Sequence, residues 1–382
     1  MIKFLPYGRQ FIDEEDINSV VNVLKNDYIT QGPRIGLFEE SLAEYCDSRY
    51  AVCFNSGTSA LHAAYYALGI GKGDEVITSP NTFVATSNAA LYLNANPVFT
   101  DVEKSTGNMD VSLVEEKITG KTKLIVPVHY SGNPVDLKSL REIAVDYNIC
   151  IVEDAAHALG ALYEGKPVGN SLYSELSVFS FHPVKHITTG EGGMVLTDNR
   201  DYYDKLVMFR SHGITKKDFQ GEPDGDWYYE MQFLGYNYRM TDIQAALGLS
   251  QLLKLPQFVR RRRSIAETYD NAFKGNQYFK TIPVTGEGVS SYHLYPILIN
   301  DEYVEMKREI FGKLRLEGLG VQVHYIPVYL QPYYQKLGYR RGSCPVSEDF
   351  YHREISIPMY PALSDGDVNQ VISKVFKVFN KL

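Results

Sequence analysis

The sequence is short of the features that mark several special classes of protein. Its four cysteines are widely spaced and form no Cys-x-x-Cys pair, which argues against a zinc site or a disulfide framework. No apolar run approaches the roughly 18–20 residues that span a bilayer, and the first residues lack the apolar core of a signal peptide. We therefore expect a cytoplasmic protein with reduced thiols, no metal and no contact with a membrane.

Positive charge is also scarce. The formal net charge of −8 argues against a nucleic acid as the main partner. One basic run exists, from Arg260 to Arg263, but four successive residues span a whole helical turn and cannot form a single stripe. We interpret this run as a solvated stretch of helix, with at most one arginine at an interface, and predict no nucleic-acid surface.

What the sequence does contain is an alternation of short apolar runs with helical patterns. The hydrophobic fraction of 44% is ordinary for a globular protein with a full core. Buried strands separated by helices are typical of a largely parallel sheet covered on both faces. The expected strands are residues 50–54, 75–79, 97–102, 123–130, 149–154, 176–182 and 192–197, with helices such as 59–69 and 136–148 between them. This pattern predicts an α/β domain with a mostly parallel seven-stranded sheet.

The pattern changes after about residue 240. We expect one helix over 241–255, another over 260–275, and then a smaller α+β unit of mixed strands and helices. The chain is accordingly divided into a large domain, residues 1–245 with an N-terminal arm, and a small C-terminal domain, residues 246–382. Residues 216–230, rich in Gly, Asp and Pro, form a predicted exposed loop and a candidate lid.

Ligands of open parallel sheets gather at the carboxyl ends of the strands, so the residues that follow each strand matter most. After residues 50–54 comes Asn55-Ser56-Gly57-Thr58-Ser59, which opens directly into a helix. Small hydroxyls, a glycine and free amides at a helix start can bind an anion, although a plain Ser or Thr N-cap explains them equally well. Phe83 follows the second strand, where it is either a ring at the ligand edge or a core phenylalanine.

Two charged residues sharpen this prediction. Asp154 ends a buried strand, which is costly unless a cation pairs with it. Lys185 lies in the loop FSFHPVKHITTGEGG and, taken alone, is a surface lysine. We call the helix start at residues 55–59 the anion cup. Together with this cup and the ring of Phe83, the two charged residues match a phosphate, a planar ring, a cationic ring nitrogen and an aldehyde, the four features of pyridoxal 5′-phosphate. A lysine would hold that aldehyde covalently, and a carboxylate would keep the ring nitrogen protonated.

At this point the sequence resembles the DegT/DnrJ/StrS sugar aminotransferases, which are fold type I pyridoxal-phosphate enzymes. The resemblance covers essentially the whole chain and depends on several segments taken together. They are YITQGP (28–33), NSGTSALH (55–62), GDEVITSPNTFVATSNA (73–89), VEDAAHALGA (152–161), SFHPVKHITTGEGG (180–193), RSHG (210–213), GYNYRMTDIQAALGLSQL (235–252) and VHYIPVY (323–329).

The resemblance implies roles for residues of this chain. Lys185 matches the cofactor-binding lysine, Asp154 the acid on the ring nitrogen, and His157 the residue near the phenolic oxygen, where many relatives carry Gln. The implied cofactor contacts are Ser56, Gly57, Thr58 and Ser180 at the phosphate and Phe83 against the ring. Asn237 resembles an asparagine that reaches the cofactor of the neighbouring subunit, which implies a homodimer with shared sites.

The resemblance also implies a reaction, the transfer of the amino group of L-glutamate to C4 of a UDP-4-keto-6-deoxy-N-acetylhexosamine, as in pseudaminic acid synthesis. The implied substrate contacts are Tyr7, Thr30, Arg239, His324 and Tyr325. A strand end packed on the core is the alternative for His324 and Tyr325. Other keto sugar nucleotides (a UDP-4-keto-pentose, a D-gluco UDP-4-keto sugar or a dTDP-4-keto-6-deoxyhexose) remain open, as does a binding protein that has lost catalysis.

Overall fold

A seven-stranded sheet forms the centre of the molecule in the computed structural model, which describes residues 3–26, 28–284 and 286–382. The strand order is β2-β10-β9-β6-β5-β3-β4, and only β10 runs antiparallel to its neighbours. The strands are β2 (Tyr50–Phe54), β3 (Glu75–Thr78), β4 (Asn96–Phe99), β5 (Thr122–Val126), β6 (Cys150–Asp154), β9 (Leu176–Ser180) and β10 (Gly193–Thr197). The predicted α/β fold with a mostly parallel seven-stranded sheet is confirmed.

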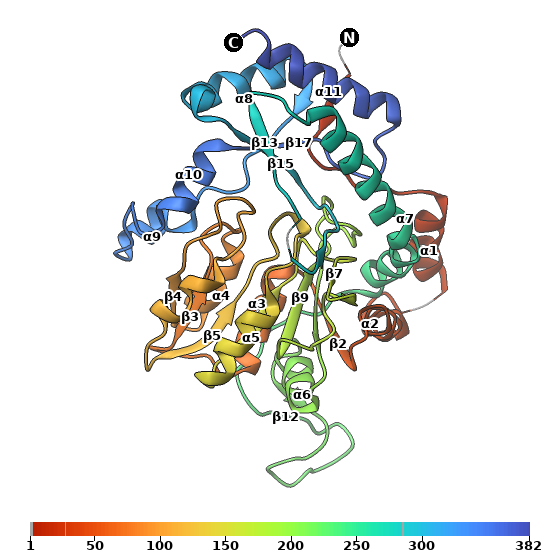
Figure 1. Cartoon of the computed structure of the whole chain (residues 1–382). Coiled ribbons are helices and arrows are strands. Elements are labelled where there is room, and N and C mark those ends of the chain that lie inside the picture. The colour runs from red at the N-terminus through yellow and green to blue at the C-terminus, as the bar shows by residue number, and fades with distance from the viewer. Residues whose placement is uncertain (1–2, 27, 285) are drawn as a thin grey trace.

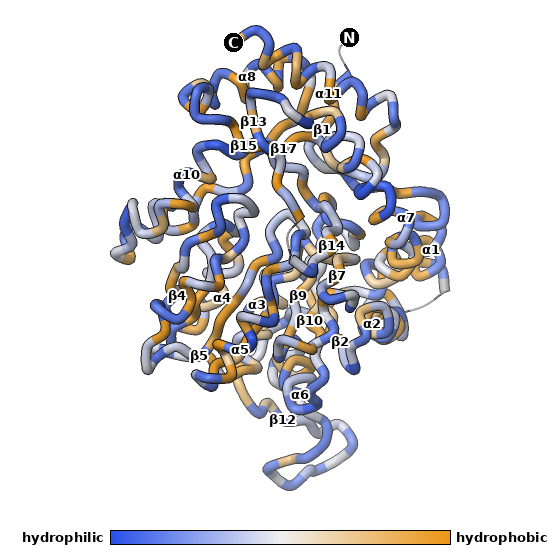
Figure 2. Tube along the Cα trace, viewed as in Figure 1, coloured by the Kyte–Doolittle hydropathy of each residue, from blue (hydrophilic) through white to orange (hydrophobic). Residues whose placement is uncertain are grey.

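Both faces of this sheet are apolar, because successive side chains of a strand point to opposite sides. One face carries Val52, Val152 and Val178 and packs under α3 (Gly57–Ala67), α4 (Ala85–Tyr92) and α6 (Arg200–Phe209). The other face packs against α2 (Pro33–Cys46), α5 (Leu137–Asp146) and α7 (Asp242–Phe273). Figure 1 shows this layering, and Figure 2 shows hydrophobic residues concentrated along strands such as β5.

Helix α7 corrects the prediction of two helices in this region. It runs unbroken over 32 residues, with Pro256 inside it. A proline removes one backbone hydrogen bond and normally breaks a helix. Here Leu255, Phe258 and Val259 on either side of it are buried against the large sheet, so packing holds the helix together. The predicted domain boundary at residues 245/246 falls within α7, and the helix runs from the large sheet to the small domain (Figure 1).

Arg262 in α7 contradicts the prediction of a solvated basic run. Its side chain is fully buried, and its Nη1 donates to the carbonyl oxygens of Tyr292, His293 and Met359, each at 3.1 Å. Burial lowers the pKa of Arg262 to about 9. Only the neighbour Arg260 is fully solvated, so the run has one face in the core.

We expect Arg262→Ala to lower the free energy of unfolding by about 2–4 kcal/mol, because it leaves a cavity and three unpaired carbonyls. Urea unfolding measures this loss. The matched control is Arg260→Ala in the same helix, which should change stability by less than about 0.5 kcal/mol. Equal losses in the two variants would contradict the structural role of Arg262.

The small domain is built on the antiparallel sheet β13-β15-β17, which has its own apolar core. Strand β1 of the N-terminal arm pairs with β16 and so joins the arm to this domain. The elements are β1 (Leu5–Pro6), β13 (Phe279–Thr281), β15 (Tyr295–Ile299), β16 (Leu319–Gly320), β17 (Glu354–Ile357), α8 (Lys307–Leu316), α9 (Pro332–Lys336), α10 (Pro345–Arg353) and α11 (Asp365–Phe379).

The remaining elements are short or peripheral. They are α1 (Glu14–Asn26), β7 (Leu162–Tyr163), β8 (Lys166–Pro167), β11 (Ile214–Thr215), β12 (Glu230–Met231) and β14 (Gly288–Val289). The β11–β12 hairpin carries residues 216–230, which are largely exposed and project from the end of the molecule away from the small domain (Figure 1). Within the described part of the chain, no helix is long and apolar enough to cross a membrane.

Candidate active site

Asp154 stands at the carboxyl end of β6, nearly buried at 5% exposure. Its Oδ2 accepts a hydrogen bond from the Thr86 hydroxyl at 2.6 Å, and its Oδ1 accepts one from the Ala156 amide at 3.2 Å. Thr86 lies in the first turn of α4, where the Thr82 hydroxyl is 2.8 Å from its own hydroxyl. These donors hold the carboxylate in one orientation. Sequence reasoning did not select Thr86, although a hydroxyl in the first turn after a strand end was a usable signal.

Lys185 lies in the loop between β9 and β10. The loop is closed on itself, since the Thr188 hydroxyl and the Thr189 amide both donate to the Phe181 carbonyl, at 2.9 and 3.1 Å. Burial lowers the pKa of Lys185 to about 8, and the negative charge of Asp154 partly opposes this. About a tenth of an amine with such a pKa is neutral at pH 7, far more than for an ordinary lysine. Lys185 is therefore suited to act as a nucleophile and a base.

His157 joins this group from the turn that follows β6. Its Nε2 lies 3.0 Å from the Tyr325 hydroxyl, and its ring is 4.3 Å from that of His293. Burial, reinforced by the positive charge of Lys185, lowers the pKa of His157 well below its usual value, so the imidazole is neutral at pH 7. Its Nδ1 is buried and has no hydrogen-bond partner in the described residues. That nitrogen is available to a ligand.

The small domain and the N-terminal arm complete one side of this group. The ring of Tyr7 lies 5.2 Å from that of His324, and the ring of Phe83 lies 6.5 Å from that of Tyr325. Phe83 is 60% exposed, so its interpretation as a core residue is wrong. Tyr325 packs against the core, as the alternative interpretation has it, and its hydroxyl also lies beside His157; its contact with substrate stays a prediction.

The anion cup begins α3. The Ser56 hydroxyl accepts a hydrogen bond from the Ser59 amide at 3.1 Å, so its side chain is the helix N-cap. The amides of Gly57 and Thr58 lie in the first turn, where a helix offers no acceptor of its own. A β-carbon on Gly57 would come within 3.0 Å of the Ser180 β-carbon, so the cup is closely bounded by β9.

Three predicted site residues lie apart from this group. Thr30 forms an isolated bridge with Thr241, and Asn237 forms one with Ser211. Asn237 is exposed, and Arg239 is half-buried. No hydrogen bond or ring contact joins Thr30, Asn237 or Arg239 to Lys185 or Asp154 among the residues that the structure describes. Within one chain, contacts join His157 to Tyr325, Phe83 to Tyr325 and Tyr7 to His324, whereas these three residues have no such contact with the group.

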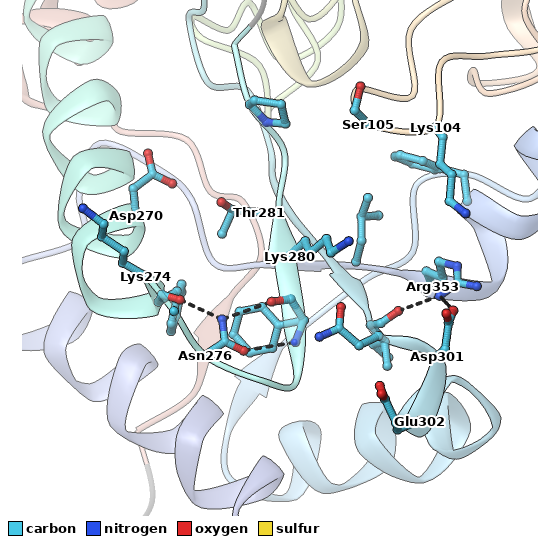
Figure 3. A pocket seen from close by; sticks show the side chains of 18 of the residues that line it. Lys104, Ser105, Asp270, Lys274, Asn276, Lys280, Thr281, Asp301, Glu302 and Arg353 are labelled. Carbon is cyan, nitrogen blue, oxygen red and sulfur yellow. Dashed lines mark hydrogen bonds and ion pairs between the residues drawn. The ribbon is translucent and has the colours of Figure 1, made fainter.

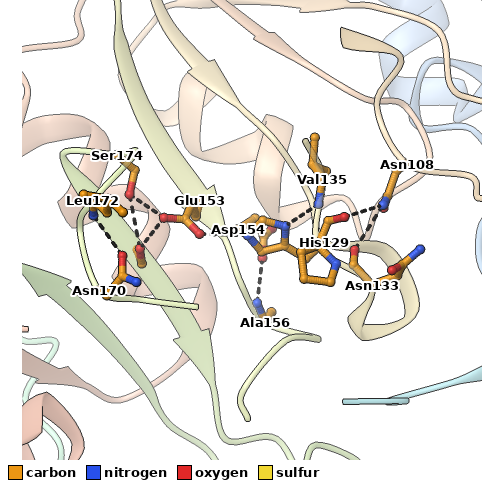
Figure 4. A network of polar contacts seen from close by, with 12 residues as sticks. Asn108, His129, Asn133, Val135, Glu153, Asp154, Ala156, Asn170, Leu172 and Ser174 are labelled. Carbon is orange, nitrogen blue, oxygen red and sulfur yellow. Dashed lines mark hydrogen bonds and ion pairs between the residues drawn. The ribbon is translucent and has the colours of Figure 1, made fainter. Parts of the chain in front are cut away.

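A buried polar network supports Asp154 from the next residue along β6 (Figure 4). Glu153 accepts hydrogen bonds from the Ser174 and Ser177 hydroxyls at 2.5 and 3.0 Å. His129 Nδ1 accepts from the Val135 amide, so its Nε2 donates to Glu153 at 2.9 Å. Burial alone would raise the pKa of Glu153, but these hydrogen bonds outweigh it and lower the pKa. Glu153 is therefore a fixed anion that anchors the strand end.

A separate cavity of about 1050 Å³ lies in the small domain, beside β13 (Figure 3). Its charged side chains are of both signs, and some of them pair with one another. Arg353 pairs with Asp349 at 2.8 Å and with Asp301 at 2.6 Å. None of the predicted site residues lines this cavity, and we assign no ligand to it.

The residues around Lys185 fit pyridoxal phosphate. The unpartnered Nδ1 of His157, the oriented carboxylate of Asp154 and the partly neutral amine of Lys185 match its polar groups. The closely bounded cup at Gly57 suits a phosphate, which backbone amides at a helix start bind well. The sheet and this site define an aminotransferase of fold type I, and the enzyme depends on pyridoxal phosphate.

Comparison with known proteins gives the family. The chain belongs to the DegT/DnrJ/EryC1/StrS aminotransferase family, whose sequence model matches residues 10–376. It is 41% identical to the UDP-4-amino-4,6-dideoxy-N-acetyl-beta-L-altrosamine transaminase of Campylobacter jejuni over 383 residues, covering 99% of this chain and 98% of that protein.

Two solved structures resemble it over nearly their whole length. Helicobacter pylori PseC, an aminotransferase of pseudaminic acid biosynthesis, has a TM-score of 0.94 at 39% identity and full coverage of both chains. Spr1654 of Streptococcus pneumoniae, assigned as a sugar aminotransferase, has a TM-score of 0.91 in its PLP-form at 33% identity, with 99% of both chains covered.

Proposed function

We propose that this enzyme transfers the amino group of L-glutamate to C4 of a UDP-4-keto-6-deoxy-N-acetylhexosamine, the product being a 4-amino sugar nucleotide of pseudaminic acid biosynthesis. The observation that carries the proposal is the convergence of Lys185, Asp154 and His157 at one sheet edge, with Tyr325 of the small domain above them. Relatives from two bacteria that bear the name of this transaminase support the choice of substrate.

In this proposal, the two charged residues do most of the chemistry. Bound pyridoxal phosphate supplies an aldehyde and an electron-accepting ring. Asp154, held by Thr86, keeps a proton on the ring nitrogen. Lys185 holds the cofactor between turnovers, and its freed amine takes the proton from Cα of the amino donor and returns one to C4 of the sugar.

The other residues bind and orient. His157 Nδ1 would hydrogen-bond the phenolic oxygen of the cofactor, and Phe83 would pack on its ring. Ser56, Gly57, Thr58 and Ser180 would surround the phosphate, with Gly57 and Thr58 donating their amides. The sugar nucleotide contacts Tyr7, His324 and Tyr325 of one chain, and Thr30 and Arg239 act where two subunits meet.

A panel of keto sugars tests the substrate. The purified enzyme is given L-glutamate and, in turn, UDP-4-keto-6-deoxy-N-acetylhexosamines of L-arabino and D-xylo configuration, a UDP-4-keto-pentose and a dTDP-4-keto-6-deoxyhexose. NMR reads the configuration of each product. We expect the L-arabino N-acetylhexosamine to give the highest kcat/KM, and a higher value for the pentose or the dTDP sugar would overturn the assignment.

We also propose a homodimer with shared sites. Large apolar side chains are exposed on segments that flank the cup, including Tyr28 at 74%, Leu234 at 75% and Tyr236 at 36%. The Asn237 segment is tied to the cup strand, since the Asn55 amide donates to the Tyr238 carbonyl at 2.8 Å. Asn237 is exposed there. A second copy of the chain would cover these apolar groups and receive Asn237 at its phosphate.

Mixing inactive subunits tests this sharing. Lys185→Ala and Asn237→Ala chains are inactive alone, but their mixed dimer has one site with an intact Lys185 and an intact Asn237. Random mixing should restore about a quarter of the wild-type activity, because half of the dimers carry one good site of two. The control mixture of Lys185→Ala with Asp154→Asn should restore none. Equal recovery in both mixtures, or none in either, would contradict shared sites.

A further inference from the structure

A buried carboxylate of the small domain lies behind His324. Glu354 is the first residue of β17 and is fully buried. Two backbone hydrogen bonds between Gln322 and Ser356, at 2.8 and 3.2 Å, lay the segment before His324 alongside β17. No hydrogen bond or ion pair joins Glu354 or Ser356 to Lys185, Asp154 or His157 among the described residues. Their hydrogen bonds reach this group through His324.

His324, Ser356 and Glu354 are linked by a chain of hydrogen bonds in which the donor and the acceptor of each bond can be assigned. The His324 backbone amide donates to Glu354 Oε2 at 2.7 Å, and the Ser356 hydroxyl donates to Glu354 Oε1 at 2.5 Å. His324 Nδ1 is 2.8 Å from the same Ser356 hydroxyl. An ionised carboxylate can only accept hydrogen bonds, so the single hydroxyl hydrogen of Ser356 must point to Glu354. Ser356 can then only accept from His324, and Nδ1 must carry a hydrogen.

The imidazole of His324 is neutral, which leaves one proton for two nitrogens. Burial, aided by the positive charge of Lys185, lowers the pKa of His324 to about 3. A neutral ring with its proton on Nδ1 has a lone pair on Nε2. The ring lies against Tyr7 and next to Tyr325, on the side of the site that faces substrate in the proposed function.

We propose that Glu354, in its ionised form, and Ser356 are positioning residues that fix His324 as the Nδ1–H tautomer, so that its Nε2 accepts a hydrogen bond from a donor group of the sugar nucleotide. A hydroxyl or an N-acetyl N–H supplies such a donor, whereas a ketone oxygen does not. The nature of this ligand rests on the proposed function, but the tautomer itself does not.

The charge on Glu354 depends on its surroundings. Lys307 is its basic neighbour, and the Lys307 side-chain nitrogen lies 4.7 Å from the centre of the Tyr351 ring, but burial lowers the pKa of Lys307 to about 8. The negative charge of Glu354 adds to burial in raising the pKa of the Tyr130 and Tyr325 hydroxyls. Burial raises the pKa of Glu354 to about 8, against the opposing effects of Ser356 and Lys307. Measurements at pH 9 therefore examine the ionised carboxylate.

Glutamine at position 354 should exchange donor and acceptor in the hydrogen bonds from residue 354 through Ser356 to His324. Its carbonyl oxygen must face the His324 amide, because an NH₂ group there would meet another donor. Its NH₂ group then donates to Ser356, and Ser356 donates to His324 Nδ1. In Glu354→Gln the proton of His324 therefore moves to Nε2, and the site gains a donor where the wild type has an acceptor.

Solid-state ¹⁵N NMR of the whole enzyme with labelled histidine reads this tautomer directly, and the signal is assigned by its loss in His324→Asn. At pH 9 we expect Nδ1–H in the wild type, Nε2–H in Glu354→Gln, and a mixture in Ser356→Ala. The control Ser347→Ala removes an equally buried hydroxyl that has no hydrogen-bond partner in the described residues and should keep Nδ1–H. An Nε2–H signal in the wild type, or Nδ1–H in Glu354→Gln, would overturn the proposal.

Kinetics with the preferred sugar of the panel then separates positioning from folding. At pH 9, where Glu354 of the wild type is ionised, we expect Glu354→Gln to raise KM for the sugar nucleotide about tenfold, the loss of one hydrogen bond, with kcat changed by less than about threefold. A rise in KM for glutamate alone would contradict the assignment of Nε2 to the sugar. Because the NMR measurement needs no substrate, it can succeed even if the proposed substrate is wrong. If Glu354→Gln does not fold, the wild-type spectrum alone still shows which nitrogen of His324 carries the hydrogen.

Discussion

A Lys185→Ala variant should fold as the wild type does and lose amino transfer by at least about 10⁴-fold, since it removes both the covalent anchor and the proton carrier. The folding expectation follows from the loop itself. Its closure depends on Thr188, Thr189 and the Phe181 carbonyl, not on the lysine side chain. Turnover with glutamate measures the loss, and the visible absorption band of lysine-bound cofactor should vanish at the same time.

The pKa of Lys185 adds a pH dependence. Only the neutral amine attacks an aldehyde, and a lysine becomes neutral as pH rises through its pKa. With that pKa lowered to about 8 by burial, the cofactor-free enzyme should bind pyridoxal phosphate covalently at a rate that rises with pH through about 8 and then levels off. Turnover that survives in Lys185→Ala would refute the enzyme assignment.

Replacing Asp154 by asparagine should leave a folded enzyme with turnover lowered on the order of 10³-fold, because a neutral amide cannot hold the ring nitrogen protonated. An amide oxygen can still accept the hydrogen bond from Thr86, which is why we expect the fold to persist. Circular dichroism checks the fold, and turnover with a fixed amino donor measures the loss.

Glu153 offers a matched control for this variant. It is also a buried carboxylate at the end of β6, but its partners are His129, Ser174 and Ser177 rather than groups of the site. Glu153→Gln should therefore lower stability and keep most of the activity. If Glu153→Gln and Asp154→Asn lose equal activity while folded, the loss reflects damage to the strand end and not the ring nitrogen.

Much of the fold could be predicted because its signals are local. The seven strands are short apolar runs, several of them separated by helices, and all seven occur where the periodicity indicates them. Once these strands form a parallel sheet, Asp154, Phe83 and the Ser56 turn fall at one edge. The positions of these candidate residues thus followed from strand ends, whereas the roles of His157, Ser180 and Asn237 came from the family resemblance.

What could not be predicted depends on contacts between distant segments. Pro256 breaks the helical pattern, and only packing of its neighbours on the sheet reveals that α7 continues. In the sequence Arg262 cannot be told from an exposed arginine, because the three carbonyls that accept its hydrogen bonds come from two other segments. The approach of His293 to His157 joins two domains and has no counterpart in local periodicity.

The order of the strands has a consequence for how substrate choice can change. The cup follows β2, the lysine loop joins β9 to β10, and Asp154 ends β6, so the three lie on four successive strands. Neighbouring strands are held about 4.8 Å apart by their ladders. The sheet therefore fixes the distances between the cup, Lys185 and Asp154. Tyr7, His324 and Tyr325, the proposed substrate contacts, come from outside this sheet, so we expect them to be replaceable for a new sugar without a change in the sheet.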